Sequence, residues 1–153
     1  MNNKKNNEGN FIIREIKVED YENGYLDLLY EFTNYKYKIN KIQFENYLNK
    51  MKNNNFNKIL IITTKFDKKI IGAGTIFILE KLHNNPIGQI EDIIITNIYR
   101  GNGLGKILIE KLINIGLVEF NCYKIILNCL SKNKEFYNKC NFIDIGIEMK
   151  YNK

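Results

Sequence analysis

The chain has 153 residues, 44% of them hydrophobic and 26% charged, which suits one domain with its own core and excludes global disorder. Its formal charge of +6 favours anionic partners, yet the lysines form no arm or stripe, so a dedicated nucleic-acid binder is not expected. No apolar run reaches the roughly 18 residues that a membrane span requires. A single histidine without any C-x-x-C spacing argues against a metal site.

The three cysteines, Cys122, Cys129 and Cys140, lie in the last third of the chain. Their odd number and the absence of a signal peptide predict a reducing, cytosolic location. Each is expected to be a small buried apolar residue rather than a nucleophile.

The first residues predict a tail, a strand and a helix. Residues 1–10 are polar and rich in Asn and Lys, so we expect a disordered tail ahead of a single domain over 11–153. Phe11–Glu15 predicts a strand, and Asp20 is a plausible N-cap for the next helix. The apolar face of that helix consists of Tyr21, Tyr25, Leu28, Leu29 and Phe32.

The middle of the chain predicts a second helix and a pair of strands. The helix is expected over 41–51, with an Asn-rich loop over 52–57 after it. Two strands, 59–64 and 70–82, are joined by a turn of several residues over 66–69.

A loop over 82–88 then leads to a strongly β-branched strand over 89–95. After it comes a Gly-rich turn and a helix that runs through Phe120, with apolar residues at helical spacing. The last third predicts a strand over 124–129 and a short helix over 133–139.

Residues 142–151 predict one or more terminal strands. The order β-α-α-β-β-β-α-β-α-β, without internal repeats, indicates an α/β layered domain.

The turn between strand and helix is the strongest chemical signal in the sequence. It reads T-N-I-Y-R-G-N-G-L-G-K from Thr96 to Lys106. Alternating glycines let a backbone wrap closely around a ligand, and the free N–H groups of a helix N-terminus attract a phosphate. The spacing fits neither a P-loop nor a dinucleotide-binding fingerprint. A tight turn without a ligand is the alternative.

Arg100-x-x-Gly103-x-Gly105, placed between a β-branched strand and an amphipathic helix, resembles the pyrophosphate-binding motif of the GNAT acyltransferase superfamily. The resemblance implies a mixed central sheet flanked by helices, with acetyl-CoA as the co-substrate. The backbone N–H of Ile94 would polarise the thioester carbonyl. The residues implied in cofactor binding are Ile93, Ile94, Ile95, Arg100, Gly101, Asn102, Gly103, Leu104, Gly105, Lys106, Asn128 and Tyr137.

Three further segments narrow the resemblance to the glucosamine-6-phosphate N-acetyltransferase family. They read Q-I-E-D-I-I-I over 89–95, C-Y-K-I-I-L-N-C over 122–129 and N-K-E-F-Y-N-K-C-N-F over 133–142. This implies acetyl transfer to an amino-sugar phosphate in a homodimer whose sites are completed by the partner's C-terminal region. The residues implied in substrate binding are Thr33, Lys81, His83, Glu91, Asp92, Ile93, Tyr123 and Lys124.

Two groups are expected to carry the chemistry. Strand alternation sends the side chains of Glu91 and Asp92 to opposite faces, and Glu91 is the better candidate for reaching the amine. By resemblance, Tyr137 lies beside the coenzyme sulfur and donates its proton to the thiolate. The alternatives are an exposed carboxylate with a strand-end cap, and a packing tyrosine.

The chain departs from the family at two positions. Asn128 stands where the family commonly has an acidic residue, and Asn152 stands near the end of the chain, where the family can have an Arg that helps to bind phosphate. Phosphate recognition is therefore expected to depend on Lys81, Lys124, Lys150 or Lys153.

The tail over 145–151 alternates like an edge strand that pairs with a partner, whereas a monomer with a covered edge is the alternative. Two other functions remain open. One is acetylation of a protein N-terminus, a lysine or another small amine, and the other is non-catalytic binding of coenzyme A or nucleic acid.

Overall fold

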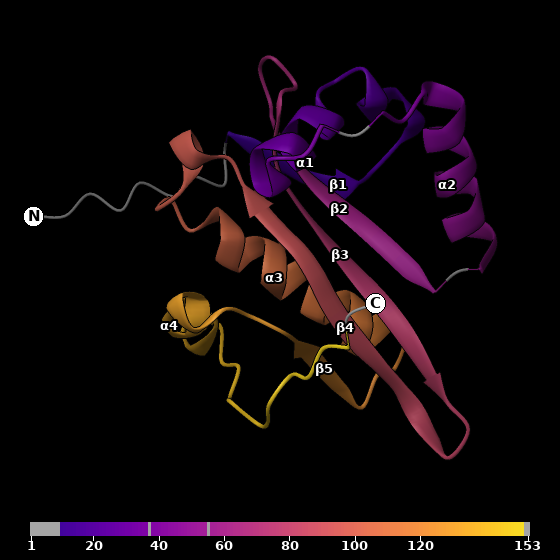
Figure 1. Ribbon diagram of the computed structural model, residues 1–153, viewed down its shortest axis with the longest axis vertical. Coiled ribbons are helices and arrows are strands. Elements are labelled where there is room, and N and C mark those ends of the chain that lie inside the picture. The colour runs from indigo at the N-terminus through magenta and orange to yellow at the C-terminus, as the bar shows by residue number, and fades with distance from the viewer. Residues whose placement is uncertain (1–9, 37, 55, 152–153) are drawn as a thin grey trace, which may run out of the picture.

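A computed structural model describes residues 10–36, 38–54 and 56–151, and it contains one five-stranded sheet with helices on both faces (Figure 1). The strands are β1 (Phe11–Glu15), β2 (Asn57–Thr64), β3 (Ile70–Lys81), β4 (Asn84–Ile95) and β5 (Lys124–Leu127). The α-helices are α1 (Tyr25–Thr33), α2 (Lys41–Asn54), α3 (Leu104–Asn114) and α4 (Lys134–Asn138).

The strands lie in chain order across the sheet, β1-β2-β3-β4-β5. Neighbouring strands are antiparallel from β1 to β4, and β5 is parallel to β4. A parallel neighbour needs a crossover, and α3 supplies it. The mixed sheet flanked by helices confirms the expected fold class.

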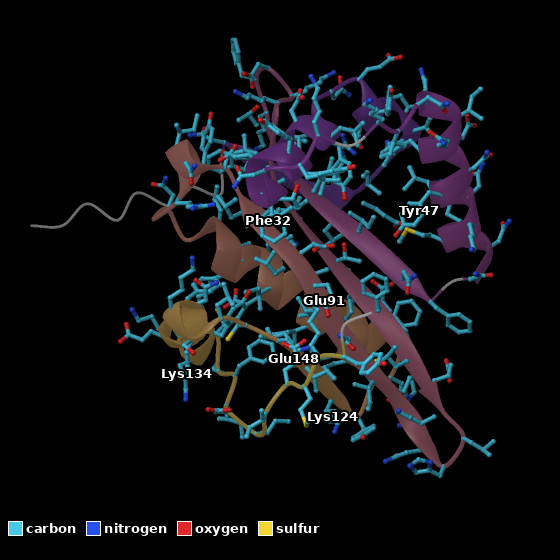
Figure 2. All side chains as sticks on the ribbon, in the orientation of Figure 1. Phe32, Tyr47, Glu91, Lys124, Lys134 and Glu148 are labelled. Atoms are coloured by element: carbon cyan, nitrogen blue, oxygen red, sulfur yellow. The ribbon has the colours of Figure 1, made fainter. Side chains whose placement is uncertain are left out.

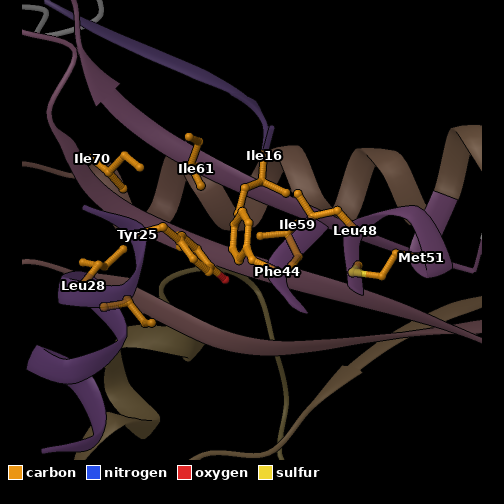
Figure 3. Close-up of a cluster of buried hydrophobic side chains, with 11 residues drawn as sticks. Ile16, Tyr25, Leu28, Phe44, Leu48, Met51, Ile59, Ile61 and Ile70 are labelled. Atoms are coloured by element: carbon orange, nitrogen blue, oxygen red, sulfur yellow. The ribbon is translucent and has the colours of Figure 1, made fainter. Parts of the chain in front are cut away.

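The sheet separates two hydrophobic clusters, because successive side chains of a strand point to opposite faces. On β2, Ile59 and Ile61 pack with α1 and α2, whereas Leu60 and Ile62 pack with α3. Figure 3 shows the first cluster, in which Tyr25 and Phe44 from the two N-terminal helices meet the strands. Their ring centroids are 5.8 Å apart. This face of the sheet, covered by α1 and α2, is called the α1–α2 face below.

Asp20 has a different role from the one predicted. It lies in a short 3₁₀ turn, Val18–Tyr21, and α1 begins only at Tyr25 after Gly24. The Asp20 carboxylate is fully buried and accepts hydrogen bonds from Arg14 Nη1 and Nη2 at 2.8 and 2.7 Å. The N-cap prediction was wrong because an ion pair across the turn, which sequence spacing does not reveal, holds this carboxylate.

Several element boundaries also differ from the prediction. The expected loop over 82–88 is a two-residue turn, because β4 already begins at Asn84 and pairs with β3 from Lys81 onward. Helix α2 continues into the expected Asn-rich loop as far as Asn54. Of the expected tail, residues 1–9 lie outside the described part, and the Asn10 carbonyl accepts a hydrogen bond from Lys65 N.

The predicted terminal strand over 142–151 is wrong for the single chain, because these residues form no strand. The side chains of Ile145, Ile147, Met149 and Tyr151 are exposed by 73%, 93%, 92% and 94%. A strand needs a neighbour that accepts its hydrogen bonds, and this segment pairs with none of the five strands of the chain.

Two of the three cysteines are buried as expected, Cys122 and Cys140, but Cys129 is exposed just after β5. Across residues 10–36, 38–54 and 56–151, no helix is both long and apolar enough to cross a membrane.

Candidate functional site

The parallel strands β4 and β5 pair along only part of the length of β4. Their pairing runs from Ile87 opposite Lys124 to Ile90 opposite Leu127, and it stops there. Strand β4 continues for five more residues without β5 beside it, up to Ile95. The far half of β4 therefore presents backbone groups to an open gap at this edge of the sheet.

A β-bulge interrupts β4 where the gap begins. The register with β3 shifts between Ala73 opposite Ile94 and Thr75 opposite Glu91, so two residues of β4 stand opposite Gly74. Asp92 takes the left-handed conformation at a φ of 52°.

The bulge changes which face each side chain meets. Ile90 packs in the α3 cluster, whereas Ile94 packs in the cluster beneath α1 and α2, although strict alternation would place both on one face.

The prediction that Glu91 and Asp92 point to opposite faces was therefore wrong. Glu91 pairs with Thr75, and opposed residues of two strands share a face. Thr75 and Asp92 both line a cavity on the α1–α2 face. The bulge thus brings both carboxylates to this face. Glycine within a strand is a sequence signal for a bulge or a close backbone approach, and Gly74 of β3 lies opposite this bulge.

The amide that faces the gap is not that of Ile94. Thr96 N donates to Ile71 O of β3 at 2.9 Å, so the amide two residues earlier, at Ile94, also faces β3. The carbonyl of Ile95 faces the other way, because it accepts a 2.9 Å hydrogen bond from Arg100 Nε. By this alternation the N–H groups of Ile93 and Ile95 point into the gap, and the expectation for Ile94 is corrected accordingly.

The Gly-rich turn leads directly from this gap into α3. Gly101 and Gly103 have φ values of 79° and 80°, a conformation that costs an ordinary L-residue roughly 1–2 kcal/mol. A Cβ built on either glycine meets no atom within 4 Å, so the turn is open on its outer side. Helix α3 begins at Leu104 with no side-chain cap on its first N–H groups. These features fit the binding of a phosphate at the helix N-terminus.

Hydrogen bonds from two side chains hold the turn in shape. Asn102 Nδ2 donates to the carbonyls of Tyr99 and Arg100, at 3.1 and 3.4 Å. Arg100 ties the turn back to β4 through the bond to Ile95 already described. On the first turn of α3, Lys106 lies 3.8 Å from Glu110 in an exposed pair. The ligand-facing backbone is thus ordered before a ligand arrives.

Gly105 lets α4 approach α3 closely. A Cβ on Gly105 would lie 3.1 Å from Cζ of Phe136, tighter than most side-chain contacts. Tyr137 follows Phe136 in α4, and its ring packs edge-to-face against Phe136 and Phe142, with centroids 5.0 and 6.2 Å away. The close approach packs α4, which carries Tyr137, against the start of α3.

The phenol of Tyr137 is suited to donating a proton. Burial raises its pKa, and Cys129, Cys140 and Glu91 raise it further. The phenol therefore stays protonated at neutral pH.

A cavity of about 480 Å³ lies between the sheet and helices α1 and α2. Figure 2 shows Phe32 and Tyr47 coming from the two helices, with Glu91 at the middle of β4. The cavity walls are mostly apolar, and Asp92 is the carboxylate among them. The lining residues are Tyr25, Leu26, Leu29, Phe32, Thr33, Lys38, Ile39, Gln43, Phe44, Tyr47, Leu48, Ile59, Thr75, Phe77 and Asp92.

Three ionisable groups that line the cavity have raised pKa values. Burial raises the pKa of the Asp92 carboxyl, and the neighbouring charge of Glu91 raises it further. Burial likewise raises the pKa values of the Tyr25 and Tyr47 phenols, and the charge of Asp92 adds to both shifts. A carboxylate beside two protonated phenols is a natural acceptor for an amine or a hydroxyl group.

Glu91 is held in place by its own strand. Gln89 lies two residues earlier on the same face, and its Nε2 donates a hydrogen bond to Glu91 Oε1. One carboxylate oxygen is thereby fixed, and the other remains available to a ligand.

The structure brings only some of the other expected substrate residues to this site. Thr33 ends α1 and lines the cavity. Lys81 and His83 lie at the β3–β4 turn. Lys81 is six residues along β3 from Thr75, a distance of roughly 20 Å.

Lys124 pairs with Ile87, which is four residues before Glu91. Lys124 therefore lies roughly 13 Å along the strand from Glu91. The Nζ atom of Lys124 lies 5.2 Å from the centroid of the Tyr123 ring. Asn128 is exposed just beyond the last paired residue of β5, at the start of the gap. Lys150 lies in the tail, and Asn152 and Lys153 lie outside the described residues.

Sequence reasoning missed the helix residues that complete the cavity. Tyr25 and Tyr47 read as members of an apolar helical face, which they are, and nothing in their spacing marks them as neighbours of Asp92. Lys38 lies in the loop between α1 and α2 and looked like one more scattered lysine.

Comparison with known proteins links the chain and its fold to one family. The model of the Acetyltransferase (GNAT) family matches residues 13–142. Glucosamine 6-phosphate N-acetyltransferase 1 of Dictyostelium discoideum is 37% identical over 139 residues, 89% of this chain and 87% of the relative. Glucosamine 6-phosphate N-acetyltransferase of Candida albicans is 31% identical, over 91% and 93% of the two chains.

Among solved structures, the crystal structure of glucosamine-6-phosphate N-acetyltransferase from Arabidopsis thaliana superposes with a TM-score of 0.86 at 28% identity. The match covers 93% of this chain and 97% of that one.

Proposed function

The chain belongs to the acetyltransferase (GNAT) family, and we propose that it transfers the acetyl group of acetyl-CoA to the 2-amino group of D-glucosamine 6-phosphate. The observation that carries this proposal is the β4 bulge. It lies between an open phosphate-binding turn on one side and a cavity lined by Asp92 on the other. The donor and the acceptor would meet there from different directions.

The donor side offers backbone groups. The N–H groups of the turn from Gly101 to Lys106 suit the pyrophosphate of the coenzyme, because they are uncapped and open to the outside. The amides of Ile93 and Ile95 suit the pantetheine arm, since they face the gap without β5 beside them. Asn128 follows the last paired residue of β5, at the start of the gap, and Tyr137 would lie beside the coenzyme sulfur there.

The acceptor side offers carboxylates. Asp92 lines the cavity, and Glu91 lies on the same face with one oxygen held by Gln89. Asp92 would contact the sugar, and Glu91 would accept a proton from the amine, directly or through a water molecule. Thr33 would contact the sugar at the rim of the cavity.

Acetyl-CoA supplies an acetyl thioester, whose carbonyl carbon forms a C–N bond with the amine as its C–S bond breaks. The amide of Ile93 or Ile95 donates a hydrogen bond where the carbonyl oxygen gains negative charge. Tyr137 donates its phenolic proton toward the leaving sulfur, and Glu91 takes the proton that the amine loses. No group of the protein becomes covalently attached to the acetyl group.

One assay tests this function. The protein is mixed with acetyl-CoA and a panel containing glucosamine 6-phosphate, glucosamine, a free-amino-terminal peptide and a lysine peptide, and free thiol is followed over time. Thiol release that is fastest with glucosamine 6-phosphate is expected. Release with a peptide alone would instead favour the protein-acetylating alternative.

Replacing Asp92 by Asn is expected to stabilise the protein and weaken its activity. Because burial raises the pKa of Asp92 in the folded state, its ionisation opposes folding above that pKa. The variant should gain less than about 1 kcal/mol at neutral pH, since solvent screens this partly exposed group. The gain should vanish as pH falls below the pKa and Asp92 becomes neutral.

Thermal unfolding of both proteins between pH 3 and pH 8 measures this difference, and the assay above measures the loss of activity. Asp67→Asn is the control, because its exposed carboxylate has a lowered pKa and should show the opposite trend with pH. An Asp92→Asn variant that is less stable at pH 8 would contradict the argument.

We further propose a homodimer in which the tail of each chain completes the partner's site. The alternating residues Ile145, Ile147 and Met149 are exposed and unpaired by any of the five strands, which favours pairing with a second copy. Light scattering should give the mass of two chains, and Ile147→Asp should give the mass of one. Ile42→Asp, on the exposed side of α2, should leave the dimer intact.

A monomeric wild-type chain at micromolar concentration would rule the dimer out. We also expect a cytosolic location, because three free thiols suit a reducing compartment.

A further inference from the structure

A side-chain hydrogen bond joins α1 to the segment that leads from β4 into the Gly-rich turn. Asn97 N donates to Oε1 of Glu31 at 2.8 Å, although 66 positions separate the two residues. Glu31 lies in the last turn of α1, and Asn97 begins a short 3₁₀ turn, Asn97–Tyr99, directly before Arg100. Across the described residues, 10–36, 38–54 and 56–151, no other side chain of α1 hydrogen-bonds to the chain between β4 and α3. The contact thus links a helix of the acceptor cavity to the turn proposed for the coenzyme.

The 3₁₀ turn has no cap from its own sequence neighbours. Thr96 stands at the N-cap position, but its side chain makes no capping hydrogen bond. Its buried Oγ1 has no hydrogen-bond partner in the described part of the chain. The first N–H groups of a helix have no partner within the helix, so a partner must come from elsewhere. The Glu31 carboxylate supplies it, and a hydrogen bond to an ionised acceptor is stronger than one between neutral groups.

The 3₁₀ turn connects this contact to the Gly-rich turn. The Asn97 carbonyl accepts a 3.3 Å hydrogen bond from Arg100 N. The Tyr99 carbonyl accepts one from Asn102 Nδ2 at 3.1 Å, and the Tyr99 ring packs edge-to-face on Phe11 with centroids 5.9 Å apart. A shift of Asn97 would therefore displace the backbone of Arg100 and the hydrogen bond of Asn102, next to the glycines.

The end of α1 that carries Glu31 also forms part of the cavity wall. Phe32 and Thr33 line the cavity, and Figure 2 shows Phe32 on this helix. Buried Tyr25 and Leu28 anchor the first half of α1, whereas residues 31–33 are exposed. An isolated helix of only nine residues is marginal in water, so the position of its end depends on tertiary contacts such as the one made by Glu31.

We propose that Glu31 is a positioning residue that couples the two substrate sites, an inference that rests on the proposed function. A coenzyme that orders the Gly-rich turn holds Asn97 in place, and Glu31 then fixes the end of α1 and the cavity wall beside it. An acceptor that packs on Phe32 and Thr33 stabilises the turn in return, because coupling between two binding sites is reciprocal. The second ligand to bind therefore meets a site that is already ordered.

The test measures the affinity for coenzyme A, which has no acetyl group to transfer, with and without saturating glucosamine 6-phosphate. In wild type the sugar phosphate should lower the Kd for coenzyme A by about 5- to 10-fold, at the lower end of couplings between sites. Glu31→Met removes the acceptor oxygens and keeps a good helix former, so the factor should fall below about twofold. Glu31→Gln should restore most of it, because the amide oxygen still accepts the hydrogen bond from Asn97.

Glu45→Met is the matched control. Glu45 is exposed on α2, does not line the cavity and makes no side-chain hydrogen bond within the described ranges. This variant should show the same coupling factor as wild type.

Amide hydrogen exchange tests the link without any acceptor. Coenzyme A alone should slow exchange at the end of α1 by a similar factor in wild type and Glu31→Gln, but not in Glu31→Met. This measurement depends on coenzyme binding and not on the identity of the acceptor.

Equal coupling in wild type and Glu31→Met would overturn the assignment, and so would an equal loss in Glu45→Met, which would indicate a general effect of the substitution. Turnover of glucosamine 6-phosphate by a wild type without coupling would leave the proposed function standing and remove the role of Glu31. Conversely, a wild type in which coenzyme A protects α1 through Glu31, but which does not acetylate glucosamine 6-phosphate, would contradict the proposed acceptor and support the role of Glu31.

Discussion

Replacing Tyr137 by Phe is expected to lower kcat by about 100-fold while changing the KM for acetyl-CoA by less than about twofold. The substitution removes one oxygen and keeps the ring. The edge-to-face contacts with Phe136 and Phe142 are made by the ring, so the position of α4 should be preserved. The loss should therefore fall on the step in which the sulfur departs.

The size of this effect follows from the state of the phenol. Burial and neighbouring Cys129, Cys140 and Glu91 raise its pKa, so the proton is present at the pH at which the enzyme works. An ordinary thiol has a pKa of about 8.5, below that of a phenol, so full proton transfer is uphill and the main contribution is a hydrogen bond to the developing thiolate. A leaving group that is already stable as an anion should need Tyr137 less.

Steady-state kinetics with both substrates varied measures the effect, and calorimetry measures coenzyme affinity. Tyr30→Phe is the control, since Tyr30 is a half-exposed tyrosine of α1 that does not line the cavity. Turnover of Tyr137→Phe equal to that of wild type would remove Tyr137 from the catalytic residues. Equal losses in kcat and in coenzyme binding would assign it to positioning the coenzyme instead.

Replacing Asp20 by Asn is expected to lower the free energy of unfolding by about 2–4 kcal/mol and the melting temperature by about 5–10 °C. Asp20 is fully buried, and it accepts hydrogen bonds from Arg14 and from the backbone N–H of Lys17 at 2.7 Å. The Asn side chain keeps the volume but leaves the Arg14 charge without its counter-charge. Because the Arg14 side chain is 30% exposed, water offsets part of the cost.

The same pair predicts a loss of stability in acid. Burial alone would raise the pKa of Asp20, but the hydrogen bonds from Arg14 and Lys17 outweigh it and hold the pKa below its ordinary value. A depressed pKa adds stability that is present above the unfolded-state pKa and is lost as pH falls through the folded-state value. The difference in stability between wild type and Asp20→Asn should therefore shrink as pH falls below about 4.

Chemical denaturation across this pH range measures the difference. Glu22→Gln is the control, because the Glu22 and Lys41 side chains are 66% and 49% exposed, so solvent screens their ion pair and its loss should change stability little. Equal losses in the free energy of unfolding of the two variants would mean that burial does not make the Arg14–Asp20 pair more stabilising than an exposed ion pair.

Much of the fold followed from local patterns. The β-branched runs, the helical spacing after the Gly-rich turn and the short helix around Tyr137 all appeared close to the expected places. The predictions were wrong where contacts between residues far apart in the sequence determine the structure. Asp20 has the sequence context of a helix cap, but its carboxylate pairs with Arg14 instead. The tail over 142–151 has the pattern of a strand, but it has no neighbouring strand in its own chain.

The features of the candidate site likewise divide into those set by local sequence and those set by tertiary contacts. The sequence by itself determined the Gly-rich turn, because positive φ at Gly101 and Gly103 and an uncapped helix start are local requirements that glycine meets. The predictions for Glu91 and Tyr137 rested on residue type and on the family resemblance, and they remain predictions.

Only the tertiary structure decided how these groups face one another. The bulge opposite Gly74 put Glu91 and Asp92 on one face and turned the amides of Ile93 and Ile95, rather than that of Ile94, into the gap. The packing of α1 and α2 over that face enclosed the cavity and brought Lys38 and Asp92 into its lining. The reason is physical: strand register and helix packing join residues far apart in the chain, and spacing along the sequence does not encode which of them meet.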